Sequence, residues 1–237
     1  MTTLSIATQD VLRSLSWYMS ARQTALRAAL SFRTQLSVTD QTDMRIHYSS
    51  YFLYLLAATE LFRQTTTLLP NKFEEQMNLR FVFDGFPDGK ANFSYVRELR
   101  NAVIHRGLDI TSAAHFVGSF PMILAEPKVT DQWKTKTFFA FDKYLLHVIA
   151  KCELIVGPVM LDCLNAAGIF EATLDAETAV SNLREEVEQS QAMPEHVKAM
   201  ALLTEFKPEW LVDAHSSAMA KLRGALAPCD TINPSAS

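Results

Sequence analysis

The sequence predicts an all-α protein, an up-and-down helical bundle followed by a C-terminal helical extension. Three observations favour this class. The chain has 237 residues and only 7 glycines, too few for a turn-dense β fold. No proline or glycine occurs before Pro70, which favours long helices at the start of the chain. Apolar residues make up 49% of the chain and can form a sizeable core. We expect a bundle over residues 1–170, an extension over 171–228 and a disordered tail over 229–237.

Two long helices are expected at the N-terminus. Apolar residues recur three to four positions apart between Val11 and Leu30, which predicts a helix over residues 8–36. Residues 37–43 are rich in N-cap residue types and separate it from the next helix, over residues 41–69. The middle of this second helix is apolar on nearly every side, as in a buried central helix.

The next segment alternates loop and helix. Residues 70–92 contain the turn-forming stretch DGFPDGKAN, so we expect mostly loop, with one helical turn near residues 73–77. A short helix over residues 93–106 follows, with Asn92 or Ser94 as N-cap and Gly107 as its left-handed C-terminal residue.

The remaining chain is predicted to be largely helical. Residues 109–131 stay open between loop and a short β-hairpin near 118–130, with strands at 120–124 and 127–130. A strong helix over residues 136–167 should be kinked or divided at Pro158. Three shorter helices are expected over residues 176–191, 194–206 and 208–225.

Several classes of function lack their markers. The chain has no HExxH, CxxC or GxSxG motif, so we expect neither a metal nor a cofactor. Its three cysteines are widely spaced, and no secretory signal or membrane span is evident, which indicates a soluble, cytoplasmic protein. The 22 Lys and Arg against 26 Asp and Glu give a net charge of -4, which argues against broad coating of nucleic acid.

One predicted helix, over residues 93–106, carries a chemically distinct pattern. At ~100° per residue, its core face is apolar: Val96, Leu99 and Val103. The opposite side carries one polar stripe at spacings of four: Arg97, Asn101 and His105. Arg100 flanks this stripe, and Arg106 is expected to leave the helix at its end.

These side chains suit RNA cleavage without metal. Histidine titrates near neutrality and can remove the proton of a ribose 2′-OH, which then attacks the adjacent phosphate. Arginine stays charged, and its fork fits phosphate oxygens. One helix supplies only one histidine, so a second motif from a two-fold partner would supply the acid.

The segment Arg100-Asn101-Ala-Val-Ile-His105 resembles the Arg-x4-His signature of the HEPN superfamily. The aromatic-rich stretch over residues 51–62 is similar to the bundle helix that members place before the motif. The resemblance implies an all-α bundle, usually a homodimer in which two motifs face each other across a cleft. It implies Arg100 and His105 as the catalytic pair, with Asn101 as the residue that orients or supports them.

Three hypotheses follow. The leading one is a metal-independent endoribonuclease, with Arg97 and Arg106 as substrate-binding residues, in a toxin or phage-defence setting with an antitoxin as partner. Its substrate would be RNA in a folded form, such as a tRNA loop. The alternative is a non-catalytic HEPN module that binds nucleotide, RNA or a partner protein. The third is a helical scaffold in which Arg100 and His105 only cap the helix end.

Overall fold

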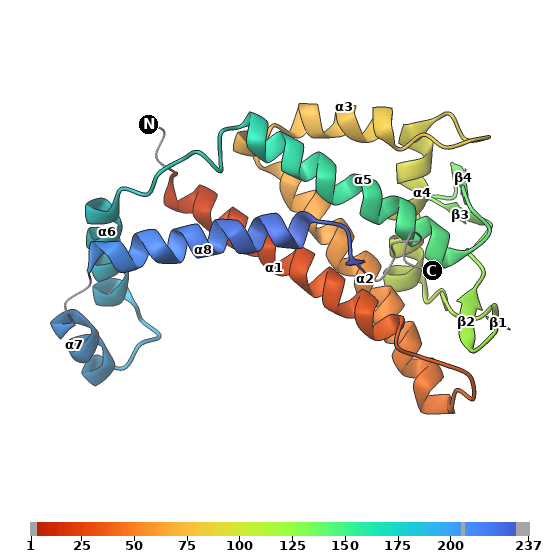
Figure 1. The fold of residues 1–237 in the computed structure, drawn as a ribbon, viewed down its shortest axis with the longest axis horizontal. Coiled ribbons are helices and arrows are strands. Elements are labelled where there is room, and N and C mark those ends of the chain that lie inside the picture. The colour runs from red at the N-terminus through yellow and green to blue at the C-terminus, as the bar shows by residue number, and fades with distance from the viewer. Residues whose placement is uncertain (1–3, 205–206, 231–237) are drawn as a thin grey trace.

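The computed structural model describes residues 4–204 and 207–230, and these are mostly helical, as predicted (Figure 1). The helices are α1 (Ile6–Ala29), α2 (Val38–Gln64), α3 (Pro70–Arg80), α4 (Gly89–Arg106), α5 (Leu145–Ala166), α6 (Ala176–Gln189), α7 (Glu195–Leu203) and α8 (Pro208–Leu226). A 3-10 turn, Thr66–Leu68, lies between α2 and α3. The strands are β1 (Ala114–Val117), β2 (Phe120–Ile123), β3 (Lys128–Thr130) and β4 (Thr137–Phe139).

Local capping explains where the long helices begin and end. Ser37 and Asp40 form a capping box at the start of α2, in which each side chain accepts the other residue's backbone N–H. The carboxylate of Asp88 accepts the N–H of Ala91, 2.9 Å away, so α4 begins one turn before the predicted Asn92 or Ser94. Gly107, with φ of 71°, ends α4 in the left-handed conformation, as predicted.

Asn92 has a different role from the predicted cap. It is buried in α4, and its side-chain amide donates to the carbonyl oxygens of Phe81, at 2.9 Å, and Phe86, at 2.8 Å. These bonds fasten the loop between α3 and α4 to the helix. The loop is shorter than predicted, because Pro70 starts a helix of 11 residues where we expected one turn.

The β structure differs from the single hairpin predicted near residues 118–130. Two separate antiparallel hairpins form, β1 with β2 and β3 with β4. The predicted strands exist as β2 and β3, but each pairs with a neighbour that the sequence pattern did not reveal. Since β4 takes up part of the segment expected to be helical, α5 begins at Leu145 and not at residue 136.

Helix α5 runs through Pro158 without being divided. A proline inside a helix costs ~3 kcal/mol, because it removes one hydrogen bond and crowds the preceding turn. Its neighbours Val156, Val159 and Met160 are completely buried and offset this cost through packing.

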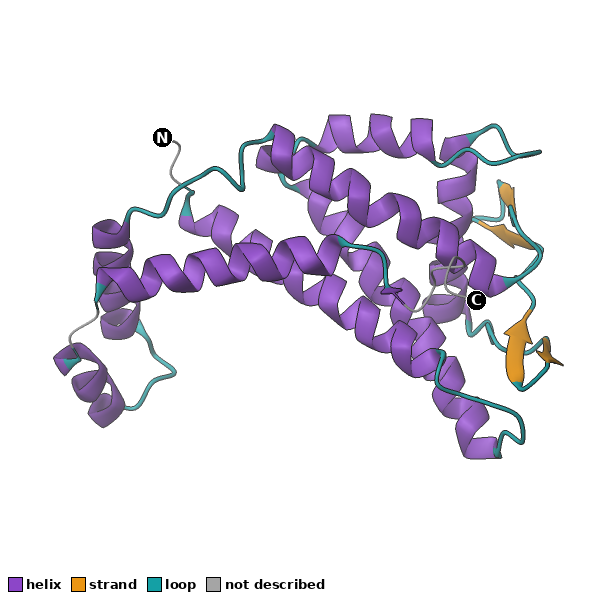
Figure 2. Cartoon of the chain, in the orientation of Figure 1, coloured by secondary structure: helices purple, strands orange, loops and turns teal. Residues whose placement is uncertain are grey.

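The core lies between α1, α2, α4 and α5. Helices α1 and α2 pack along each other, and α5 packs against α3 and α8. The predicted central helix is confirmed in α2, where Tyr51, Phe52, Leu55 and Leu56 are fully buried. Figure 2 shows the strands at one end of the bundle, with α6, α7 and the start of α8 at the other. No helix in the described part of the chain combines the length and apolar composition needed to cross a bilayer.

The end of α8, which we placed in the extension, packs into the bundle core. Leu222, Ala225 and Leu226 are buried there, and so is Cys229, which we placed in the terminal tail. Residues 231–237 of that tail lie outside the described residues.

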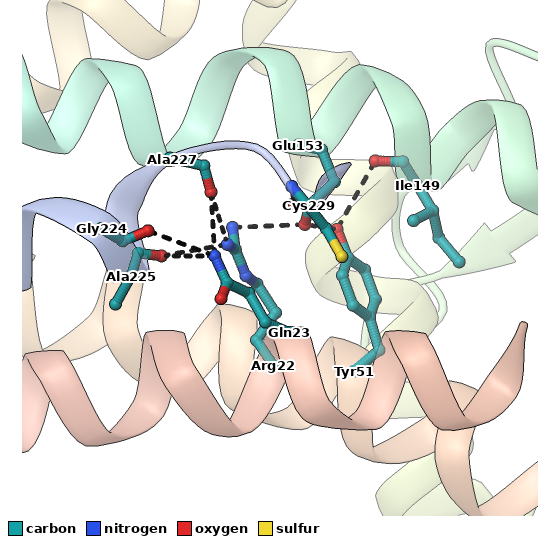
Figure 3. Close-up of polar contacts among 9 residues, drawn as sticks. All are labelled: Arg22, Gln23, Tyr51, Ile149, Glu153, Gly224, Ala225, Ala227 and Cys229. Atoms are coloured by element: carbon teal, nitrogen blue, oxygen red, sulfur yellow. Dashed lines mark hydrogen bonds and ion pairs between the residues drawn. The ribbon is translucent and has the colours of Figure 1, made fainter. Parts of the chain in front are cut away.

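A buried polar network holds this end in place (Figure 3). Arg22 of α1 donates to the carbonyl oxygens of Ala225 and Ala227, both at 3.1 Å. Glu153 of α5 accepts the Cys229 N–H at 2.8 Å and the Tyr51 hydroxyl, also at 2.8 Å. The last turn of a helix leaves carbonyl groups without partners in the helix, and α1 supplies donors to them here.

Candidate nucleic-acid interface on α4

The structure confirms the two-sided character predicted for α4. Tyr95, Val96 and Leu99 are completely buried, and Ala102 is nearly so. The opposite side reaches the surface, where Arg97 and Asn101 are half-buried and His105 is exposed. The helix therefore presents the predicted polar residues toward solvent.

Arg100 is held by a carboxylate on the neighbouring helix. Its Nη2 donates to Oε1 of Glu60, on α2, in an ion pair. The Arg100 side chain is only 12% exposed, whereas that of Glu60 is 45% exposed. Burial lowers the pKa of the Arg100 guanidinium below its usual value. Arg100 is thus a fixed cation beneath the surface, and Glu60 is a partner that the sequence pattern did not identify.

His105 lies in the last turn of α4. Among the described residues its imidazole has no hydrogen-bond or ion-pair partner. It follows Arg100 by five positions, which corresponds to about 140° around the helix and about 7.5 Å along it. The two side chains of one chain therefore point in different directions, and the structure does not bring them into contact.

The prediction that Arg106 leaves the helix is wrong, because α4 includes Arg106. Its Nη2 donates to the carbonyl oxygen of Glu98 at 3.0 Å and lies 3.9 Å from the Glu98 carboxylate. The Glu98 side chain is only 10% exposed and lies eight positions earlier in α4. This pairing therefore directs the Arg106 side chain back along the helix. Its guanidinium is less available to a substrate than we expected.

Helices α2 and α4 together form one surface, which we call the α2–α4 face. It consists of a stripe on each helix: Ile46, Leu53 and Glu60 on α2, and Arg97, Arg100 and Ile104 on α4. The two stripes meet at the ion pair of Glu60 with Arg100. At the far end, Arg45 lies 3.7 Å from Asp109, just after α4, so the helices stay together over this length.

Three apolar side chains are exposed on this face. Ile46 is 52% exposed, Leu53 37% and Ile104 42%. Apolar residues on two packed helices, beside arginine and histidine, suit a contact with a second protein chain. Two cavities among the described residues, of about 400 and 490 Å³, are lined by residues outside this face.

No cluster in residues 4–204 and 207–230 groups three or more His, Cys, Asp or Glu side chains that could hold a metal ion. Scans of the chain against protein-family models, curated proteins and solved structures found no match.

Proposed function

We propose that this protein is a metal-independent endoribonuclease of the HEPN type, active as a homodimer, with Arg100 and His105 as catalytic residues. The observation that carries the proposal is the placement of two different groups on α4. A solvent-exposed imidazole lies on the same helix as a guanidinium held in position by Glu60. Both lie beside the exposed apolar residues of the α2–α4 face.

The chemistry requires a base, an acid and a cation. His105 would take the proton of a ribose 2′-OH, whose oxygen attacks the adjacent phosphorus. The bond from phosphorus to the 5′-oxygen then breaks, and that oxygen takes a proton from the protonated His105 of the second chain. The products are a 2′,3′-cyclic phosphate and a 5′-hydroxyl. Arg100 would stabilise the negative charge that develops on the phosphate oxygens.

A second copy of the chain completes this set. Because Arg100 and His105 of one chain point about 140° apart, a single chain does not surround a phosphate with both. Two copies related by a two-fold axis would place the His105 of each chain near the Arg100 of the other. Burial of Ile46, Leu53 and Ile104 against their counterparts would stabilise that arrangement.

The charge distribution is compatible with RNA as substrate. Residues 1–170 contain 17 Lys and Arg against 15 Asp and Glu. Residues 171–237 contain 5 basic and 11 acidic residues, so the negative net charge comes from the C-terminal part. The bundle that carries α4 is therefore slightly basic, which favours contact with phosphates.

A non-catalytic module remains the second candidate, favoured by the state of Arg100. Its guanidinium is 12% exposed and already paired with Glu60. In such a protein the α2–α4 face would bind nucleotide, RNA or a partner protein such as an antitoxin, without turnover.

Cleavage in excess chelator separates the two candidates. Purified protein is incubated with total RNA and tRNA beside His105→Ala and, as a matched control, His196→Ala, which removes an exposed histidine of α7. The ribonuclease proposal predicts fragments ending in 2′,3′-cyclic phosphate from the parent protein and His196→Ala, and none from His105→Ala. Equal cleavage by all three proteins indicates a contaminating nuclease and contradicts the role of His105.

A stability measurement distinguishes a loss of catalysis in His105→Ala from a loss of folding. Because His105 is exposed and has no side-chain partner among the described residues, His105→Ala should change the free energy of unfolding by less than about 0.5 kcal/mol. A clearly lower melting temperature would instead support the scaffold hypothesis.

A further inference from the structure

The β3–β4 hairpin carries an exposed aromatic and basic group at its tip, residues 131–136. Trp133 is 77% exposed, although tryptophan is usually largely buried in a folded domain. Lys134 and Lys136 follow it at the tip, Lys128 lies on β3, and all three are exposed. Phe139, which pairs with Lys128 across the hairpin, is 61% exposed.

The tip has a defined conformation. The carboxylate of Asp131 accepts the backbone N–H of Thr135 at 2.7 Å and that of Lys136 at 3.1 Å. It also accepts the Thr135 hydroxyl. Lys134 has φ of 55°, a left-handed conformation that costs free energy in a residue with a side chain. The Asp131 bonds hold this strained turn, and it presents Trp133 outward.

Asp131 contributes one negative charge at the tip. Hydrogen bonds from the Thr135 side chain and the Lys136 backbone hold the pKa of Asp131 below its usual value, so it stays ionised. Asp131 is the sole acidic residue from 128 to 141, against three lysines. The hairpin is therefore a basic surface with an aromatic side chain at its centre.

The hairpin is anchored to the helix that carries the proposed active site. Both of its strands pack against α4, and Figure 1 shows them beside that helix. The Tyr95 hydroxyl of α4 donates to the Glu126 carbonyl, 2.7 Å away, just before β3. Tyr95 lies about 15 Å along α4 from His105, with Arg97 between them.

We propose that the tip of the β3–β4 hairpin binds single-stranded RNA, with Trp133 stacking on a base and Lys134 and Lys136 contacting phosphates. This inference rests on the proposed function, since it supplies the substrate contact of that site. Aromatic stacking combined with basic side chains is the usual way in which proteins hold unpaired strands. Trp133 is the only apolar residue among the six at the tip, and this composition favours a nucleic acid over insertion into a bilayer.

Binding is measured in the His105→Ala background, so that cleavage does not interfere. The probe is a fluorescein-labelled single-stranded 12-mer of uridine, followed by anisotropy in chelator at low salt. Trp133→Ala should weaken binding at least 5-fold, and Trp133→Phe should retain most of it. The matched control is Trp210→Ala, which removes another exposed tryptophan, on α8, and should leave the affinity unchanged.

The lysines are tested through the salt dependence. A double change of Lys134→Gln and Lys136→Gln should reduce the slope of log affinity against log salt by about 1.4, since each phosphate contact to a single strand contributes ~0.7. All variants should melt at the temperature of the parent, because the changed side chains are exposed.

Three results would overturn the inference: no binding of the 12-mer by the His105→Ala protein, equal effects of Trp133→Ala and Trp210→Ala in that background, or a Trp133-dependent affinity for phosphatidylserine vesicles with none for RNA. The two proposals fail separately. Cleavage that does not respond to Trp133→Ala rejects only the hairpin contact, whereas Trp133-dependent binding without any cleavage rejects only the ribonuclease.

Discussion

Arg22 of α1 and Glu153 of α5 form an ion pair inside the core, with 3.2 Å between Nη1 and Oε1 and at most 1% of either side chain exposed. Each partner also holds the C-terminal end of α8, Arg22 through two carbonyl oxygens and Glu153 through the Cys229 N–H. One buried pair therefore joins α1, α5 and the end of α8, and the first and last of these contacts lie more than 200 positions apart in the chain.

Removing one partner of this pair should be costly. Glu153→Gln leaves the Arg22 charge buried without compensation, and such changes cost about 3–5 kcal/mol. Urea unfolding should show this loss. Asp10→Asn removes the partner of Arg13 in a pair whose side chains are 62% and 73% exposed, and it should cost less than about 0.5 kcal/mol. Similar losses in both variants would contradict the buried network.

The contact between α5 and the end of α8 depends on a glycine. A Cβ on Gly157 would lie 2.1 Å from the carbonyl oxygen of Leu226, so one of the two backbones must move. Gly157→Ala should therefore destabilise the protein by about 1–3 kcal/mol.

Gly224 is the matched control for this prediction. It lies in α8, and a Cβ there meets nothing within 4 Å. Gly224→Ala should be neutral or stabilise the helix by up to ~1 kcal/mol. Thermal melts of both variants test the difference, and an unchanged melting temperature for Gly157→Ala would show that α8 does not dock as described.

The proposed dimer can be tested at the α2–α4 face. Leu53→Glu and Ile104→Glu place a charge where apolar contact is proposed, so each should shift the protein toward monomer. Light scattering after gel filtration measures the mass of each species. Leu154→Glu, at a 63% exposed position of α5, should leave the mass unchanged. A parent protein that stays monomeric at high concentration would exclude the two-chain site.

The free energy of unfolding should decrease as the pH rises above 10. Burial raises the pKa of Tyr48 to about 12 and holds the pKa values of Tyr51 and Tyr95 well above the ordinary value of 10. As pH rises through 10, the unfolded chain releases these protons while the folded chain retains them. The stability present below pH 10 is therefore lost above it, on the order of 3 kcal/mol per pH unit for three phenols.

Urea unfolding between pH 9 and 11 measures this loss. Tyr48→Phe removes one titrating group and keeps the ring in the core, so the dependence should weaken by roughly one third. A stability that does not change over this range would contradict the burial of the three hydroxyls.

Local sequence signals located most of the helices. The apolar spacing of α1, α2 and α4 is a property of a few neighbouring residues, and so are the Gly107 stop and Pro208, which begins α8. The exposure of His105 followed in the same way, because its place on the helical wheel opposite Val96 and Val103 is fixed by the helix itself.

Pairing between distant segments was decided only by the tertiary structure. The partner of Arg100 is Glu60, forty positions earlier, and β3 pairs with β4 and not with β2. A signal for the buried pair does exist in the sequence. Arg22 interrupts the apolar row that includes Met19 and Leu26, and Glu153 interrupts that of α5. Such an interruption shows that a charge is buried, but not which opposite charge meets it.

The amino-acid sequence alone determined that the chain is helical and which side of α4 faces solvent, because helical periodicity depends on residues three to four positions apart. The packed structure decided that Arg100 is a held cation, that Arg106 folds back onto Glu98, and that the end of α8 belongs to the core. Each of these depends on which partner a charge or a carbonyl group meets once water is excluded. That partner is set by which helices pack together, and not by neighbouring residues in the sequence.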